Sequence, residues 1–102
     1  MRTNKTILKV LRGDILIFIY DSAPARVKET SIISGYYEYY TTSDIKRSIS
    51  YLAQSGYIKR KEVESPISNR CEAFYEITPE GMKVVEKIKG DEGITIMEEK
   101  AE

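Results

Sequence analysis

Histidine is absent from the chain, and cysteine occurs once, at Cys71. Without histidine, the chain lacks both the commonest general base and the Cys–His pair of nucleophilic catalysis. Zinc sites that combine several Cys and His ligands are excluded for the same reason, and we expect no metal site. A lone cysteine cannot form an intrachain disulfide. We interpret Cys71 as a small, half-buried strand residue, with a disulfide between subunits as the alternative.

Long apolar runs are also missing. The longest, residues 15–20, has six residues, whereas about 20 are needed to span a membrane. The N-terminal region carries cations, but its apolar stretch is too short for a signal peptide and no small-residue cleavage site follows. We therefore expect an intracellular, cytoplasmic protein without a membrane partner.

Signatures of enzymes and of ligand sites are absent as well. The sequence shows neither a glycine-rich phosphate loop nor a readable pair of catalytic carboxylates. No cluster of polar residues suggests the lining of a small-molecule pocket. We expect no enzyme activity, no cofactor and no small-molecule effector.

The charges balance, with 16 Lys and Arg against 16 Asp and Glu, but they are unevenly distributed. Residues 1–70 contain 12 cations and 7 anions, a net of +5, whereas residues 71–102 contain 4 and 9, a net of −5. A polyanion responds to the local field, so overall neutrality is compatible with a nucleic-acid-binding face. Glutamine occurs once and asparagine twice beside abundant Lys and Glu, which indicates a thermophilic source.

One stretch reads as a capped helix followed by a glycine turn and a basic strand. Thr42 and Ser43 are both suitable N-cap residues, and Asp44 follows where a negative charge suits the helix dipole. Gly56 ends the helix at a position that often needs a positive φ. We therefore predict a helix over residues 43–55.

This helix has one apolar and one polar face. Ile45, Ile49 and Leu52 lie on one stripe at about 100° per residue. On the opposite face, Arg and Lys can read guanine or phosphates, Gln can pair with adenine, and Ser can contact either. The alternative interpretation is that this polar face is only solvated and does not bind DNA. The candidate DNA contacts of this helix are Ser43, Lys46, Arg47, Ser50, Tyr51 and Gln54.

The residues before this helix predict two further helices. The first, residues 4–21, has an apolar surface wider than one stripe, and Gly13 could divide it in two. A turn at Pro24 precedes the second, residues 25–34, which Gly35 could end. A helix that is apolar on more than one side is usually covered on more than one side, either within the core or by a partner subunit.

Four tyrosines lie within residues 36–40. This tyrosine run either continues the second helix or connects it to the third. Its side chains could stack on sugars and bases and donate hydroxyls to phosphates, or they could pack at the edge of the core or at a dimer surface.

After the central helix, the pattern predicts an antiparallel hairpin. Residues 57–64 and 71–78 read as strands, joined by the turn-rich, polar segment 65–70. Lys59, Arg60 and Lys61 occupy successive positions on the first strand, so they point to both faces of the hairpin. At least one face of this strand is therefore expected to carry cations into solvent.

A fourth helix then begins with Thr78 as N-cap and Pro79 at the first helical position, and it runs to about residue 89. Its predicted apolar residues are Met82, Val84, Val85 and Ile88. The chain therefore reads as a mainly α protein with a small β wing (α+β), with a domain over residues 1–90 and an acidic tail over residues 91–102.

The order helix, helix, helix, strand, wing, strand, helix resembles a winged helix-turn-helix transcription regulator of the MarR/PadR type, a group that includes many small archaeal and archaeal-virus regulators. Two segments within residues 11–89 carry the resemblance. One is Ile45-x3-Ile49-x2-Leu52-x3-Gly56-Tyr57-Ile58, similar to a recognition helix that runs into the first wing strand. The other is Tyr75-x-Ile77-Thr78-x2-Gly81, similar to the second wing strand and the start of the next helix.

The resemblance implies that residues 43–55 enter the major groove of DNA. It also implies that the wing, residues 65–70, lies at the flanking minor groove, with contacts from Arg70 and from Asn69 or Ser68.

The chain departs from this family in two places. The segment 35–41 is longer than the usual turn before a recognition helix, and the residues after Gly90 are too few for the long dimerisation helix of many relatives. The first helix is therefore the better candidate for a dimer contact.

These features predict a sequence-specific, double-stranded DNA-binding transcription regulator that acts as a homodimer, in the host cell if the protein is viral. Two-fold symmetry would place the recognition helices about 34 Å apart. The alternative is a winged-helix module that binds protein without direct DNA contact. Candidate phosphate contacts outside the recognition helix are Arg26, Lys28, Lys59 and Lys61.

Overall fold

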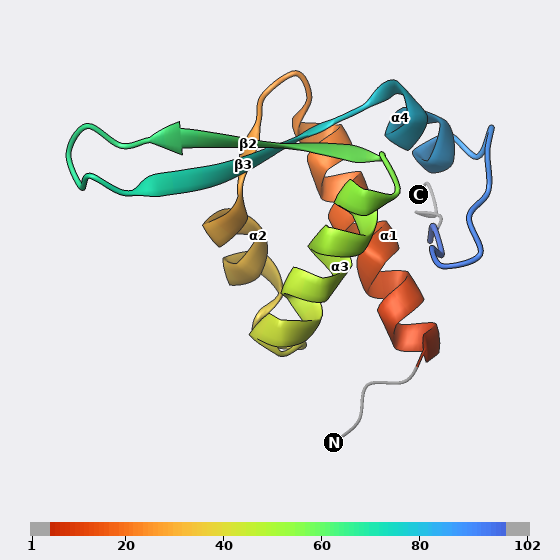
Figure 1. Cartoon of the computed structure of the whole chain (residues 1–102). Helices are drawn as coiled ribbons and strands as arrows, with labels where there is room; N and C mark the ends of the chain where they lie inside the picture. Colours follow the sequence, from red (N-terminus) through yellow and green to blue (C-terminus); the bar gives the residue numbers. More distant parts are fainter. Residues whose placement is uncertain (1–4, 98–102) are drawn as a thin grey trace, which may run out of the picture.

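The computed structural model describes residues 5–97, which form an α+β fold with four helices and a three-stranded antiparallel sheet (Figure 1). None of these helices is long and apolar enough to cross a membrane. The predicted mixed class with a small β hairpin is confirmed. In chain order the elements are α1 (Lys5–Ser22), β1 (Val27–Lys28), α2 (Glu29–Tyr36), α3 (Thr42–Gln54), β2 (Ile58–Glu64), β3 (Cys71–Ile77) and α4 (Pro79–Val85).

The core forms where α1 packs against α3. Leu11, Ile15 and Ile19 on α1 are fully buried, and so are Ile45 and Leu52 on α3. Burial of an aliphatic side chain stabilises a fold by about 1.5–3 kcal/mol, so these residues fix the rotation of α3 about its axis. The predicted apolar stripe of this helix is confirmed.

The ends of α3 and the start of α4 follow from local chemistry. The N-cap of α3 is Thr41, whose hydroxyl oxygen accepts a hydrogen bond from the Asp44 backbone N–H at 3.1 Å. The prediction of a cap at Thr42 or Ser43 is therefore wrong, by one and two residues respectively. Gly56 has a φ of 83°, as predicted. Thr78 caps α4 as predicted, accepting from the Gly81 N–H at 3.1 Å.

The second predicted helix, residues 25–34, begins later than expected. Val27 and Lys28 form β1 instead, opposite Tyr75 and Phe74 on β3, and α2 starts at Glu29. The β-branched side chain of Val27 is buried in this pairing, so a contact with a distant strand overrides the helical pattern. At its other end α2 continues through Gly35.

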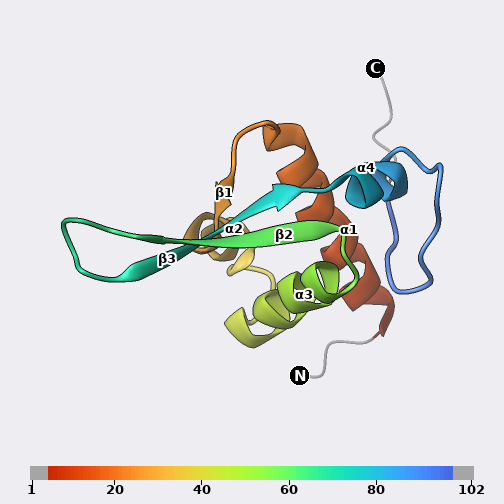
Figure 2. The same cartoon turned by 45° about the horizontal axis from the view of Figure 1, so that its top comes forward.

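The β2–β3 hairpin is confirmed, with Ile58 opposite Ile77 and Glu64 opposite Cys71. The strand order is β1-β3-β2. Figures 1 and 2 show that the hairpin projects past α2, away from the helices. Cys71 lies at its outer end and is exposed, so the expectation of a half-buried cysteine is wrong.

The last described residues fold back onto the domain. α4 ends at Val85, short of residue 89, and Ile88 is 71% exposed while Val84 is buried. Met82 is also exposed, so of the predicted apolar residues only Val84 is buried and Val85 is half-buried. The segment 91–97, which has no helix or strand, returns to α1 and buries Ile94. Residues 98–102 of the predicted tail lie outside the described residues.

Gly13 is the point at which this segment crosses α1. The helix is continuous there, so Gly13 does not divide it. A β-carbon at Gly13 would lie 1.9 Å from the carbonyl oxygen of Thr95, and the Thr95 N–H donates to the Lys9 carbonyl at 3.0 Å. The glycine is needed for close backbone approach.

This contact predicts opposite effects for two Gly→Ala substitutions in helices. Gly13→Ala should destabilise the fold by about 1–3 kcal/mol, because the added methyl group displaces the backbone at Thr95. Gly35→Ala, which meets nothing within 4 Å, should stabilise it by about 0.5–1 kcal/mol through helix propensity alone. Urea unfolding of both variants measures the difference. A stabilising Gly13→Ala would contradict the observed crossing.

Candidate nucleic-acid interface

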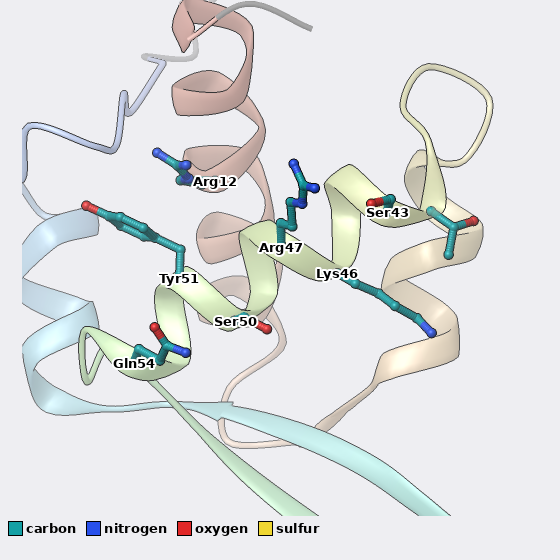
Figure 3. Close-up of a pocket in the computed structure, with 8 residues that line it drawn as sticks. Arg12, Ser43, Lys46, Arg47, Ser50, Tyr51 and Gln54 are labelled. Atoms are coloured by element: carbon teal, nitrogen blue, oxygen red, sulfur yellow. The ribbon is translucent and has the colours of Figure 1, made fainter. Parts of the chain in front are cut away.

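The exposed face of α3 lines an open groove (Figure 3). Six candidate contacts from the sequence lie together here, because they repeat every three or four residues on the side opposite the buried stripe. Arg12 lines the side of the groove that faces α1. The lining residues are Arg12, Thr42, Ser43, Lys46, Arg47, Ser50, Tyr51 and Gln54.

Two cations of this groove point to opposite sides of α3. Figure 3 shows Arg47 directed toward α1 and Lys46 directed away from it. Both are exposed, and neither forms an ion pair or a side-chain hydrogen bond with any residue between 5 and 97. Their charge is therefore available to an anionic ligand that lies along the helix. The side chains of Ser43, Ser50 and Gln54 are also exposed.

Tyr51 differs from the other groove residues because its hydroxyl is already bonded. It donates to Asp91 Oδ1 at 2.6 Å, and the side chain is half-buried. The guanidinium carbon of Arg12 lies 4.2 Å from the centre of the Tyr51 ring. Tyr51 thus forms a wall of the groove, and only its ring is left to face a ligand.

Asp91 holds this wall in place. Its carboxylate accepts from the Tyr51 hydroxyl, from the Tyr57 hydroxyl at 2.5 Å and from the Gly93 N–H at 2.7 Å. Burial would raise the pKa of Asp91, but these hydrogen bonds outweigh it and keep the pKa below its ordinary value. The bond to Asp91, followed by burial, raises the pKa of Tyr57 to about 12.

Arg12 was missed by sequence reasoning. Its Nη1 donates to the Gly93 carbonyl at 2.9 Å, across 81 positions of chain. In the local sequence it is one of three cations of α1, with Lys5 and Lys9, and it stands directly before a glycine. Nothing in that pattern indicates a partner so far along the sequence.

The cations of β2 are partly neutralised by the chain itself. Lys61 lies 3.7 Å from Glu76, and Arg60 lies 3.1 Å from Glu62 and 3.6 Å from Glu29. Lys59 is exposed and has no acidic partner among the described residues. Surface ion pairs contribute only about 0–1 kcal/mol, so a polyanion could still compete for Lys61.

Lys28 and Arg26, the other two predicted phosphate contacts, lie beside β3. Lys28 is 3.4 Å from Glu72, and both cations stand over the Phe74 ring, at 5.7 Å for Arg26 and 5.9 Å for Lys28. They are therefore part of the sheet surface and do not line the groove of α3.

The wing tip is separate from the groove. Figures 1 and 2 show the tip of the β2–β3 hairpin extended away from α3, and neither Asn69 nor Arg70 is among the residues that line the groove. Asn69 has a φ of 59°, and the Ser65 N–H donates to the Arg70 carbonyl at 2.8 Å. Arg70 is exposed without an ion pair among the described residues, and the neighbouring Ile67 is 96% exposed.

The tyrosine run divides into two kinds of residue. Tyr36 ends α2 and donates to the Asp14 carbonyl at 3.1 Å, and Tyr40 packs against the core. Tyr37 and Tyr39 are 61% and 80% exposed. The two inner tyrosines fix the connection between α2 and α3, and the two outer ones face solvent.

Comparisons with known proteins do not assign a function. A scan against protein-family models and searches of curated proteins and of solved structures give no match. The geometry of the groove is therefore the basis of the functional proposal.

The Tyr57–Asp91 bond predicts an alkaline loss of stability. The pKa of Tyr57 is near 10 in the unfolded chain and about 12 in the fold, so the folded state holds the proton more tightly. The resulting stabilisation is fully present below pH 10 and is lost as the pH rises toward 12. The free-energy advantage of the wild type over Tyr57→Phe should shrink across this range, as measured by urea unfolding. An advantage that stays constant to pH 12 would contradict the bond.

Proposed function

We propose that the chain is a winged helix-turn-helix protein that binds double-stranded DNA in a sequence-specific manner and regulates transcription. The observation that supports this most is the exposed face of α3. It combines hydroxyl and amide groups with two cations, Lys46 and Arg47, that form no ion pair with any residue between 5 and 97. The other face of the same helix is buried.

The arrangement of elements supports a winged helix. Two consecutive helices, α2 and α3, precede an antiparallel hairpin, and β1 adds a third strand to that hairpin. In helix-turn-helix proteins the second helix of the pair enters the major groove. The hairpin would then be the wing, with its tip extended from the body as in Figure 2.

The dimensions of α3 suit the major groove. A groove about 12 Å wide admits one helix. Ser43 and Gln54, at the two ends of the polar face, are eleven residues apart, which corresponds to about 16 Å along a helix axis. At about 3.4 Å per base pair, this face spans roughly five base pairs. That length matches one half-site of a two-fold symmetric operator, which a homodimer would bind with recognition helices about 34 Å apart.

Phosphate contacts would come from cations around the helix. Lys59, Lys61, Arg26 and Lys28 are the candidates on the sheet, and Arg70 is the candidate at the wing tip. If about five phosphates are neutralised per subunit, log affinity should fall with log salt at a slope of roughly −4 to −5 per subunit.

A second candidate function is a protein-binding module without DNA contact. The exposed Tyr37 and Tyr39 favour it, since aromatic residues are enriched in protein interfaces. Binding that persists at high salt and depends on these tyrosines would support this alternative.

Arg47→Ala tests the DNA-binding proposal directly. Duplexes are first selected from a genomic fragment pool with the purified protein, and affinity for the selected duplex is then measured by gel shift over a salt series. Loss of Arg47 should weaken binding by about 1–3 kcal/mol and relax specificity at one base step, if it contacts guanine with both donors.

Lys83→Ala serves as the matched control, because it removes the same charge from α4, outside the groove. We expect its affinity to stay within about twofold of the wild type. Equal affinities for Arg47→Ala and the wild type at moderate salt would contradict the proposed role of α3.

A further inference from the structure

We propose that Arg12 is an additional phosphate-binding residue on the α1 side of the α3 groove, and that the segment 91–97 positions it through Asp91 and Gly93. This inference rests on the proposed DNA binding and names a contact that the helix-turn-helix elements do not supply. It also gives the acidic end of the described chain a role in binding a polyanion.

The segment 91–97 is fixed to α1 by several contacts. The Thr95 N–H donates to the Lys9 carbonyl at 3.0 Å, Ile94 is buried, and the backbone at Thr95 passes over Gly13. These contacts lie within one turn of Arg12 on α1. The position of the Gly93 carbonyl is therefore set by the helix that carries Arg12.

Arg12 is held on two sides. The Gly93 carbonyl accepts from Nη1 at 2.9 Å, and the Tyr51 ring lies under the guanidinium at 4.2 Å. Side-chain entropy of an arginine is worth about 2 kcal/mol, and much of it is already lost here before any ligand binds. A prearranged guanidinium gives up less freedom on binding an anion.

Donors remain for a ligand. A guanidinium has five N–H groups; Gly93 takes one, and Nε is buried without a partner among the described residues. Arg12 nevertheless lines the groove, and no carboxylate among residues 5–97 forms an ion pair with it. The remaining Nη donors suit a phosphate oxygen. Figure 3 shows Arg12 on the side of α3 toward which Arg47 points, as expected for a contact on the backbone flanking the base edges.

Asp91 is a positioning residue in this arrangement. Its oxygens accept from the Tyr51 and Tyr57 hydroxyls and from the Gly93 N–H, so it fixes both surfaces that hold Arg12. Its own negative charge repels a polyanion. The two effects have opposite signs: removing the charge alone would strengthen DNA binding, whereas losing the position of Arg12 would weaken it.

The neighbouring Glu92 provides the matched control. It is exposed, and Glu92→Gln removes one negative charge at nearly the same place as Asp91→Asn without touching the hydrogen-bond network. Affinity for the selected duplex is measured over a salt series for both variants and for Arg12→Ala, Arg12→Lys and the double variant Arg12→Ala/Asp91→Asn. Circular dichroism at the binding temperature verifies that each variant is folded.

We expect Arg12→Ala to bind about tenfold more weakly and to reduce the salt slope by about 1. Arg12→Lys should restore the slope. Asp91→Asn should weaken binding severalfold, while Glu92→Gln should bind as well as the wild type or slightly better. The double variant should bind no more weakly than Arg12→Ala, because Asp91 acts through Arg12.

Two results would overturn the inference: wild-type affinity and slope for Arg12→Ala, or an Asp91→Asn variant that binds as tightly as Glu92→Gln. If Asp91→Asn does not fold, the comparison of Arg12→Ala with Arg12→Lys decides alone. Either result leaves the proposed function standing as long as the wild type binds duplex DNA. A wild type that binds no selected duplex removes both proposals.

Discussion

Burial of one stripe of α3 against α1 is the constraint on which the rest of the structure depends. Ile45, Ile49 and Leu52 are at most 1% exposed, and turning the helix would expose side chains whose burial is worth about 1.5–3 kcal/mol each. The polar face of α3, which includes Arg47, therefore has to face solvent. The charge pattern of the groove is thus a consequence of apolar packing on the opposite side of the same helix.

The covering of α1 follows from the same principle. Its apolar surface is too wide for one partner, and the sequence left open whether a second subunit covers it. In the structure the chain covers part of this surface itself, through the segment 91–97 and α4. Gly13 permits the segment to approach, and Asp91 ties it to Tyr51, which forms a wall of the groove of α3. One short segment thereby couples the core helix to the groove.

Prediction from sequence succeeded where the signal is local. The period of Ile45, Ile49 and Leu52 defines both faces of α3, and turn residues on either side of two β-rich runs define the hairpin. It failed where distant residues compete with local preference. Val27 joins a strand some 48 positions away, and α4 ends early while the chain turns back toward α1. The candidate groove residues were found because helical periodicity groups them, whereas Arg12 was not, because its partners lie at Tyr51 and Gly93.

The central claim is that duplex DNA binds the exposed face of α3. The most direct measurement is a titration of isotope-labelled protein with the selected duplex, followed by nuclear magnetic resonance of the backbone amides. The account predicts that the largest shifts fall in residues 42–54, next to Arg12 and at the wing tip, with α4 unaffected. Shifts confined to α4 or to the Tyr37–Tyr39 connection, with α3 unchanged, would contradict it.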